Sequence, residues 1–197
     1  MKAVLMSGGM DSVSIAWWKR PELAIFVDYG QRPARAERDA AAAACRAIGI
    51  PLEEVKSDCS SLGSGDMAGS EPNRHAPVSE WWPFRNQLIL TLAGMAALRR
   101  GVTELLIGTL RTDGQHADGL PDFVGRISAL MAMQEGGLTV SAPAIEFTAA
   151  ELVRTSGIRK EILAWAHSCH IGELACGRCR GCIKHLETWK ALGWDAH

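Results

Sequence analysis

The sequence predicts an α/β fold with a doubly wound, mostly parallel sheet, followed by a small C-terminal helical appendage that holds a metal knuckle. Three observations support this expectation. Short apolar and β-branched runs alternate with helical stretches along most of the chain, which is typical of parallel sheets covered by helices on both faces. A Ser-Gly-Gly turn joins the first strand to the first helix, and four cysteines cluster near the C-terminus.

The hydrophobic pattern places each element in order. Expected strands are 2–6, 23–27, 52–55, 103–107 and 138–142, and expected helices are 12–18, 34–48, 85–100, 122–134 and one or two within 148–167. Segment 57–83 is rich in Ser, Gly and Pro and is longer than a compact domain usually leaves without regular structure, so we interpret it as a mobile lid. We divide the chain into a nucleotide-binding domain, 1–147, and a helical segment with the knuckle, 148–197.

Composition excludes several classes of protein. With 197 residues and 47% hydrophobic side chains, the chain can bury one good core. The 21 basic and 22 acidic residues give a net charge of -1, so we expect no bulk nucleic-acid binding. We expect no membrane contact either, because no apolar run approaches bilayer length and the N-terminal one is too short for a signal peptide. Clustered cysteines suit a metal in a reducing compartment, so we expect a cytoplasmic protein.

The loop after the first strand has the composition of a phosphate-binding site. It consists of Ser7, Gly8, Gly9, Met10, Asp11 and Ser12. Backbone N–H groups and the helix dipole converge there, and the two serine hydroxyls can donate to phosphate oxygens. Asp11 can cap the helix or help to hold Mg²⁺. The loop is neither a Walker loop nor a Gly-x-Gly-x-x-Gly turn, and a tight turn without chemical consequence is the alternative interpretation.

This Ser-Gly-Gly-x-Asp-Ser string resembles the pyrophosphate loop of enzymes that adenylate a substrate and release pyrophosphate. Asparagine synthetases, tRNA lysidine and thiouridine synthases and NAD synthetases share it. The resemblance implies cleavage of ATP between its α- and β-phosphates. The loop alone does not choose among these enzymes.

Four cysteines near the C-terminus have the spacing of a metal site. They are Cys169, Cys176, Cys179 and Cys182. Four thiolates favour tetrahedral Zn²⁺ and leave no coordination position open, so we expect a structural ion whose binding contributes to folding. An iron–sulfur cluster and a redox pair remain alternatives.

Together, the loop and the knuckle resemble the 7-cyano-7-deazaguanine synthase family, which converts 7-carboxy-7-deazaguanine to its nitrile with ATP and ammonia in queuosine biosynthesis. The resemblance runs nearly end to end and includes the segments 28–32 (Asp-Tyr-Gly-Gln-Arg), 35–37 (Arg-Ala-Glu), 83–86 (Pro-Phe-Arg-Asn), Gly108, 112–113 (Thr-Asp) and 176–182. It implies an adenine nucleotide α-hydrolase-like, Rossmann-like fold.

Ligands of open parallel sheets bind beyond the carboxyl ends of the strands. The residues that follow the predicted strands should therefore line one cleft, and they are Ser7, Asp28, Ser57, Gly108 and Pro143. We expect Asp28 and Gly108 to bind ATP together with the loop.

For the substrate we expect a ring stacked on Tyr29 and a carboxylate or phosphate held by Gln31, Arg85 and Asn86. Asp113, Asp118 and Asp122 form an acidic loop that holds Mg²⁺ or accepts hydrogen bonds from the deazaguanine edge. Ordinary loop polarity is the alternative for each of these residues. Ser7, Asp11, Ser12, Arg85 and Asp113 are the expected catalytic group.

The chemistry implied is attack of the carboxylate on the α-phosphorus of ATP, displacement of AMP by ammonia, and dehydration of the amide in a second ATP-dependent step. Positioning and electrostatics carry such a reaction without a protein nucleophile. A homodimer is the default expectation.

Three departures from the family pattern point to a diverged paralogue. First, Ala149 stands where the family usually has a lysine, and Lys160 and Arg154 are the candidate replacements. Second, segment 117–120 (Ala-Asp-Gly-Leu) stands where the family has Tyr-Pro-Asp-Cys. Third, the chain is short. Such a paralogue would stop at the amide, use another carboxylate, or attach a deazaguanine to a protein acceptor in antiviral defence. A tRNA-modifying sulfur or lysine transferase and a non-catalytic zinc-knuckle module are the rival interpretations.

Overall fold

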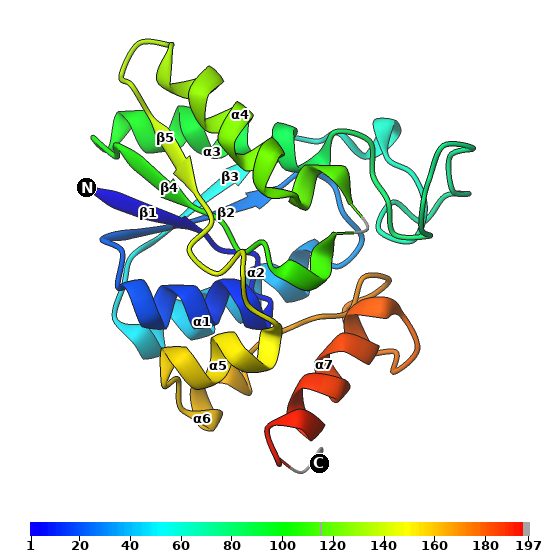
Figure 1. Ribbon diagram of the computed structural model, residues 1–197. Helices are drawn as coiled ribbons and strands as arrows, with labels where there is room; N and C mark the ends of the chain where they lie inside the picture. Colours follow the sequence, from blue (N-terminus) through cyan, green and yellow to red (C-terminus); the bar gives the residue numbers. More distant parts are fainter. Residues whose placement is uncertain (115, 195–197) are drawn as a thin grey trace.

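The computed structural model describes residues 1–114 and 116–194 and has a five-stranded parallel sheet at its centre (Figure 1). The strands lie in the order β3-β2-β1-β4-β5. Their bounds are β1 Lys2–Leu5, β2 Leu23–Asp28, β3 Leu52–Lys56, β4 Glu104–Leu106 and β5 Thr139–Ser141. The chain moves outward from β1 to β3, returns to β4 beside β1 and continues to β5. The strand order therefore reverses between β1 and β4, where ligands of such sheets bind.

Helices cover both faces of the sheet, as the sequence pattern predicts (Figure 1). On one face lie α1, α2, α5 and α6, and on the other lie α3 and α4. Their bounds are α1 Met10–Lys19, α2 Ala34–Ile48, α3 Arg85–Arg99, α4 Pro121–Ala132, α5 Ala149–Ser156 and α6 Lys160–Leu163. Strand β2 is buried along five consecutive residues because both of its faces carry helices.

Local sequence explains how these helices begin and end. Gly49 ends α2 at a φ of 83°, a left-handed conformation that glycine adopts without strain. Thr148 begins α5 with a capping box, since its hydroxyl accepts from the Glu151 N–H and the Glu151 carboxylate accepts from the Thr148 N–H. Because α5 and α6 share a hydrophobic core with α1 and α2, they belong to the layers around the sheet. The division of the chain at residue 148 stays a prediction.

The structure refines the predicted elements mainly at their ends. Strands β1, β4 and β5 are one or two residues shorter than predicted, and the first helix begins at Met10, two residues earlier. Helix α7, Arg180–Ala191, follows the knuckle and lies beyond the predicted helices. Short 3-10 turns occur at Ser60–Leu62, Arg111–Asp113 and Ala117–Gly119. Across the described part of the chain, none of the helices has the length and apolar character needed to traverse a bilayer.

Candidate active site

A cavity of about 290 Å³ opens at the carboxyl edge of the sheet. Its floor is formed by the ends of β1, β2 and β4 and by the Ser-Gly-Gly loop, and α3 forms one wall. Met67 and Glu80 of segment 57–83 line it from one side, and residues of the cysteine knuckle and of α7 line it from the other. The cavity therefore lies at the strand-order reversal, between two segments that are distant in sequence.

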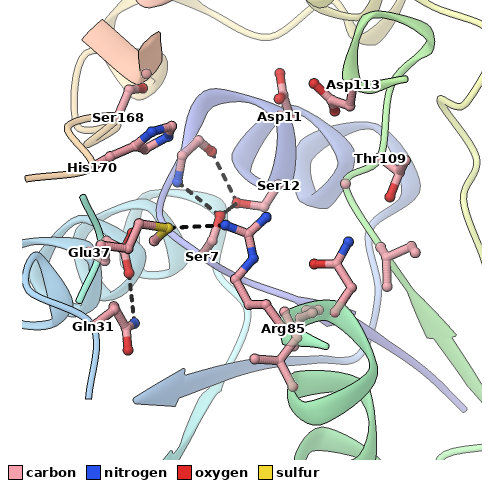
Figure 2. Close-up of a pocket in the computed structure, with 18 of the residues that line it drawn as sticks. Ser7, Asp11, Ser12, Gln31, Glu37, Arg85, Thr109, Asp113, Ser168 and His170 are labelled. Carbon is pink, nitrogen blue, oxygen red and sulfur yellow. Dashed lines mark hydrogen bonds between the residues drawn. The ribbon is translucent and has the colours of Figure 1, made fainter. Parts of the chain in front are cut away.

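The loop holds its two serines at the first turn of α1. Ser7 Oγ lies 3.1 Å from Ser12 Oγ and accepts from the Gly9 N–H over 3.3 Å, while the Ser12 hydroxyl donates to the Gly9 carbonyl over 3.0 Å. Figure 2 shows both serines facing the cavity. Gly9 precedes α1 without a side-chain cap, so N–H groups of the first turn remain available to an anion.

Gly8 supports this loop from beneath. Its φ is 77°, and an added Cβ would clash with the Glu37 carbonyl of α2. Gly8 itself does not line the cavity, and its carbonyl accepts from the His167 N–H over 2.9 Å. Gly108 plays a related part at the end of β4, because a Cβ there would stand 3.4 Å from the Ser12 nitrogen. Glycine at these positions permits the close packing of loop, α2 and β4.

Two carboxylates meet at the rim of the cavity beside the loop. Asp11 comes from the first turn of α1 and Asp113 from the turn after β4, and Figure 2 shows them side by side. Lys184 of α7 reaches both, with its Nζ 2.9 Å from Asp11 Oδ2 and 3.0 Å from Asp113 Oδ1. Although burial opposes it, the two carboxylates raise the pKa of Lys184, so the lysine is held as a cation. Paired carboxylates of this kind are also suitable ligands for Mg²⁺.

The opposite end of the cavity combines an aromatic ring with a partly buried carboxyl group. Tyr29 is buried and its ring packs edge-on against Trp82 at 5.0 Å. Gln31 Nε2 donates to Glu37 Oε2 over 2.8 Å, and Gln31 Oε1 accepts from the Tyr29 N–H over 2.9 Å. Burial raises the pKa of Glu37 to about 7. Gln31, which we expect to contact substrate, is thus engaged in holding Tyr29 and Glu37.

Arg85 and Asn86 begin α3 and both line the cavity. Arg85 Nη1 lies 3.0 Å from Met67 Sδ (Figure 2), and within the described residues its guanidinium forms no ion pair. Asn86 is fixed by Asp118, since its Nδ2 donates to the Asp118 carbonyl over 3.0 Å. Arg85 is therefore a cation in the cavity wall that an anionic ligand can pair with.

Several predicted site residues lie outside the cavity lining. Asp28 accepts from the Gly30 N–H over 3.0 Å and faces Lys56 at 3.9 Å, so it shapes the turn after β2. Asp118 is a partner of Asn86, with its Oδ2 accepting from the Asn86 N–H over 3.2 Å. Asp122 is exposed and pairs with Arg126 one turn along α4. Of the five residues at strand ends, Ser7 and Gly108 line the cavity, whereas Asp28, Ser57 and Pro143 do not.

The proposed replacements for the lysine missing at Ala149 also lie elsewhere. Arg154 donates to the carbonyl of Ala191 in α7, and Lys160 Nζ lies over the Trp189 ring at 5.3 Å. Neither lines the cavity. Helical geometry directs both side chains toward α7 instead.

Sequence reasoning missed the residues that the knuckle and α7 contribute. Ser168, His170, Arg180 and Lys184 line the cavity, and Arg180 Nη1 donates to the buried Glu80 over 2.8 Å. Although burial alone would raise it, hydrogen bonds from His116 and Arg180 lower the pKa of Glu80 to about 2. The four-residue spacing of Arg180 and Lys184 was the available signal, because it puts both cations on one face of a helix.

The four cysteines gather as predicted. Their sulfur atoms all lie within 4.8 Å of one another, and the pairs Cys176–Cys182 and Cys169–Cys179 are 3.9 Å apart. A tetrahedron of Zn–S bonds of about 2.3 Å has sulfur–sulfur edges of roughly 3.8 Å, so the residues fit one mononuclear ion. Backbone N–H groups of His170, Cys179 and Cys182 point at the sulfurs, which stabilises thiolates. The cluster can therefore hold a metal ion such as zinc.

The fold and the cavity define an α/β protein with a Ser-Gly-Gly loop at the strand-order reversal and a cysteine knuckle whose residues line the same cavity. The family model described as "Queuosine biosynthesis protein QueC" matches residues 2–193. The chain belongs to the QueC family.

Curated relatives agree with this assignment, and one solved structure shares the fold. The chain is 28% identical to the 7-cyano-7-deazaguanine synthase of Methanosarcina mazei, with 98% of this chain and 95% of that protein covered. It is 30% identical to the Chromobacterium violaceum protein of the same name, covering 96% and 89%. The U34-tRNA thiolase NcsA from Methanococcus maripaludis, solved with its [4Fe-4S] cluster, superposes with a TM-score of 0.53 at 15% identity, over 99% of this chain and 72% of that one. That likeness concerns the fold alone, and the low identity to the synthases agrees with a diverged member.

Proposed function

We propose that this protein activates 7-carboxy-7-deazaguanine, or a closely related deazaguanine carboxylate, by adenylation with ATP. The observation that carries the proposal is the loop Ser7–Ser12 at the first turn of α1. It opens into the same cavity as the aromatic ring of Tyr29, the partly buried carboxyl group of Glu37 and the guanidinium of Arg85, which forms no ion pair among the described residues. Membership of the QueC family supports the deazaguanine as the substrate.

In the proposed reaction a carboxylate oxygen attacks the α-phosphorus, and the bond from that phosphorus to the oxygen that bridges it to the β-phosphorus breaks. Pyrophosphate leaves toward the loop, where the hydroxyls of Ser7 and Ser12 and the N–H groups of the first turn stabilise its charge. In this proposal Asp11 and Asp113 would hold the Mg²⁺ that accompanies ATP, and their proximity at the rim of the cavity supports it. The Arg85 guanidinium can donate two parallel hydrogen bonds to a carboxylate or a phosphate.

Ammonia then attacks the acyl carbon and AMP leaves with the former carboxylate oxygen, which yields an amide. A second ATP-dependent step dehydrates the amide to the nitrile. Both steps depend on orientation in a sheltered cavity rather than on a protein nucleophile.

At the other end of the cavity, Tyr29 and Glu37 suit a purine-like ring. The Tyr29 ring forms an apolar wall, and Glu37 places a carboxyl group beside it. A deazaguanine ring carries N–H donors on one edge, for which a carboxyl oxygen is a directional acceptor.

For the knuckle we propose one structural Zn²⁺ held by Cys169, Cys176, Cys179 and Cys182. The sulfur spacing of 3.9 Å supports a single tetrahedral ion. A cluster of several irons would hold the four sulfurs farther apart.

The test is pyrophosphate release by the metal-loaded protein with Mg²⁺-ATP and 7-carboxy-7-deazaguanine. We expect release that depends on this carboxylate and that falls at least tenfold in Ser12→Ala, whereas Ser70→Ala, an exposed serine of the lid, stays within twofold of wild type. Release that requires tRNA instead of the carboxylate would favour a tRNA-modifying enzyme. No release with either substrate would favour a non-catalytic binding module.

A further inference from the structure

Helix α7 carries a lysine to two carboxylates at the carboxyl edge of the sheet. Lys184 lies two residues beyond the knuckle residue Cys182, yet its Nζ contacts Asp11 of α1 and Asp113 of the turn after β4. Its side chain is 30% exposed, so it is accessible from the cavity that it lines.

The same lysine borders a second depression on the other side of the acidic pair. Lys184, Asp113 and Arg180 line both hollows, and Ala149 at the beginning of α5 lines the second one. Ala149 is 5% exposed and presents only a methyl group to this hollow. A longer side chain at residue 149 would have to enter the hollow that Lys184 also lines.

We infer that Lys184 is the cation that contacts the β- and γ-phosphates of bound ATP, delivered by the knuckle helix in place of a lysine at position 149. The inference rests on the proposed adenylation. In the structure the ammonium group is held between Asp11 and Asp113. When Mg²⁺-ATP arrives, these carboxylates exchange the ammonium group for the divalent cation, and Lys184 turns on its flexible stem to the phosphates.

Electrostatics supports the exchange. A Mg²⁺ ion demands close oxygen ligands and cannot share the gap between two carboxylates with an ammonium group. A triphosphate brings several negative charges to the loop. The Lys184 ammonium, which contacts Asp11 of that loop, is therefore attracted to the phosphates once it leaves the carboxylates. A charge-assisted contact of this kind changes affinity by about tenfold or more.

The position of Lys184 depends on the knuckle. Cys179 is the N-cap of α7, and its sulfur accepts from the Cys182 N–H over 3.4 Å. A Cβ on Gly181 would clash with the Ser168 carbonyl, so the first turn of α7 is packed against the segment that leads into the knuckle. A metal ion that fixes the four sulfurs thereby fixes the base from which Lys184 extends.

The experiment measures binding of AMP and of Mg²⁺-α,β-methylene-ATP, which cannot be cleaved between its α- and β-phosphates, to the metal-loaded protein by calorimetry. Lys184→Ala is compared with Lys190→Ala, an exposed lysine at the end of the same helix, and with the double variant K184A/A149K. Metal content and thermal unfolding are recorded for each variant.

We expect K184A to weaken binding of the triphosphate analogue at least tenfold while AMP affinity stays within twofold, because AMP lacks the β- and γ-phosphates. K190A should match wild type for both ligands, and K184A/A149K should recover at least a third of the affinity for the analogue. A K184A protein that keeps its metal and binds the analogue within twofold of wild type overturns the inference. Equal losses for AMP and the analogue also overturn it, because they indicate a structural role.

The design separates this inference from the proposed function. If the wild-type protein fails to bind the analogue at all, the adenylation proposal fails and this inference fails with it. If the wild-type protein binds the analogue and K184A binds it equally well, the inference about Lys184 alone is wrong.

Discussion

Arg180 Nη1 donates to Glu80 Oε1 over 2.8 Å although the two residues stand one hundred positions apart in the chain. This ion pair joins the segment 57–83 to the knuckle helix across the mouth of the cavity. Glu80 is 4% exposed, and it also faces His116 at 3.5 Å. The two segments that enclose the site are therefore fastened to each other.

Removing this link should loosen the lid. We expect Glu80→Ala to lower the free energy of unfolding by about 1–3 kcal/mol, since Arg180 is left partly buried without its partner. Trypsin should then cleave at the exposed Arg74 of the lid several times faster than in wild type. Glu71→Ala, an exposed lid carboxylate, is the matched control, and equal cleavage of E80A and E71A would contradict the fastening role.

Acid should weaken the same link in a defined range. The pKa of Glu80 is lowered to about 2, so its contribution to stability is present above its unfolded value of 4.5 and is lost as the pH falls from there toward 2. Thermal unfolding of wild type and Glu80→Gln should therefore converge in this acid range. A stability difference that stays constant from pH 6 to pH 2 would show that the charge of Glu80 plays no part.

Titration of Glu37 should produce the opposite dependence of stability on pH. Burial raises its pKa to about 7, so between pH 4.5 and 7 the folded protein binds more protons than the unfolded chain and loses stability as the pH rises. The free energy of unfolding lost across this pH range is about 3 kcal/mol. Urea unfolding at pH 5 and pH 8 should show this loss in wild type and a smaller one in Glu37→Gln. Identical pH profiles for the two proteins would place the titration elsewhere.

A substitution at Gly8 tests the packing beneath the loop. Gly8 and Gly101 both have a positive φ, 77° and 72°, but only at Gly8 does an added Cβ meet another residue within 4 Å. Gly101→Ala should cost about 1–2 kcal/mol from backbone strain alone. Gly8→Ala should cost clearly more and should abolish binding of the ATP analogue, because α2 and the loop must separate. Equal unfolding free energies for the two variants would refute the steric argument.

Metal removal should affect nucleotide binding as well as stability. Because Cys179 begins α7 and α7 carries Lys184, chelation or Cys182→Ser should weaken binding of the ATP analogue and lower the melting temperature together. The buried Cys45 of α2 lies outside the cluster, so Cys45→Ala should keep its metal and its affinity for the analogue. Full affinity in a metal-free, folded protein would contradict the coupling.

Much of the fold follows from local sequence signals. Apolar strands such as 23–27, the glycine end of α2 and the four-cysteine spacing predict the order of strands and helices and the metal cluster. The floor of the cavity was also predictable, because Ser7 and Gly108 follow strands that end at one edge of a parallel sheet.

The rest of the site depends on long-range packing. Asp28, Asp118 and Asp122 have the right residue type but are engaged elsewhere. Asp28 accepts within its own turn, Asp118 binds Asn86 at the beginning of α3, and Asp122 pairs with Arg126. Lys184 and Glu80 reach the cavity only because the lid and α7 fold over it. A local pattern does not encode which side chain a distant segment brings to a site.

In the proposed reaction the carboxylate of the substrate becomes bonded to the α-phosphorus of ATP. The most direct measurement uses 7-carboxy-7-deazaguanine labelled with ¹⁸O in its carboxylate, with ammonia and Mg²⁺-ATP, followed by mass spectrometry of the nucleotide products. An acyl-adenylate leaves one labelled oxygen on AMP from the activation step, together with unlabelled pyrophosphate. Label in inorganic phosphate with formation of ADP, or AMP without label, would contradict the account.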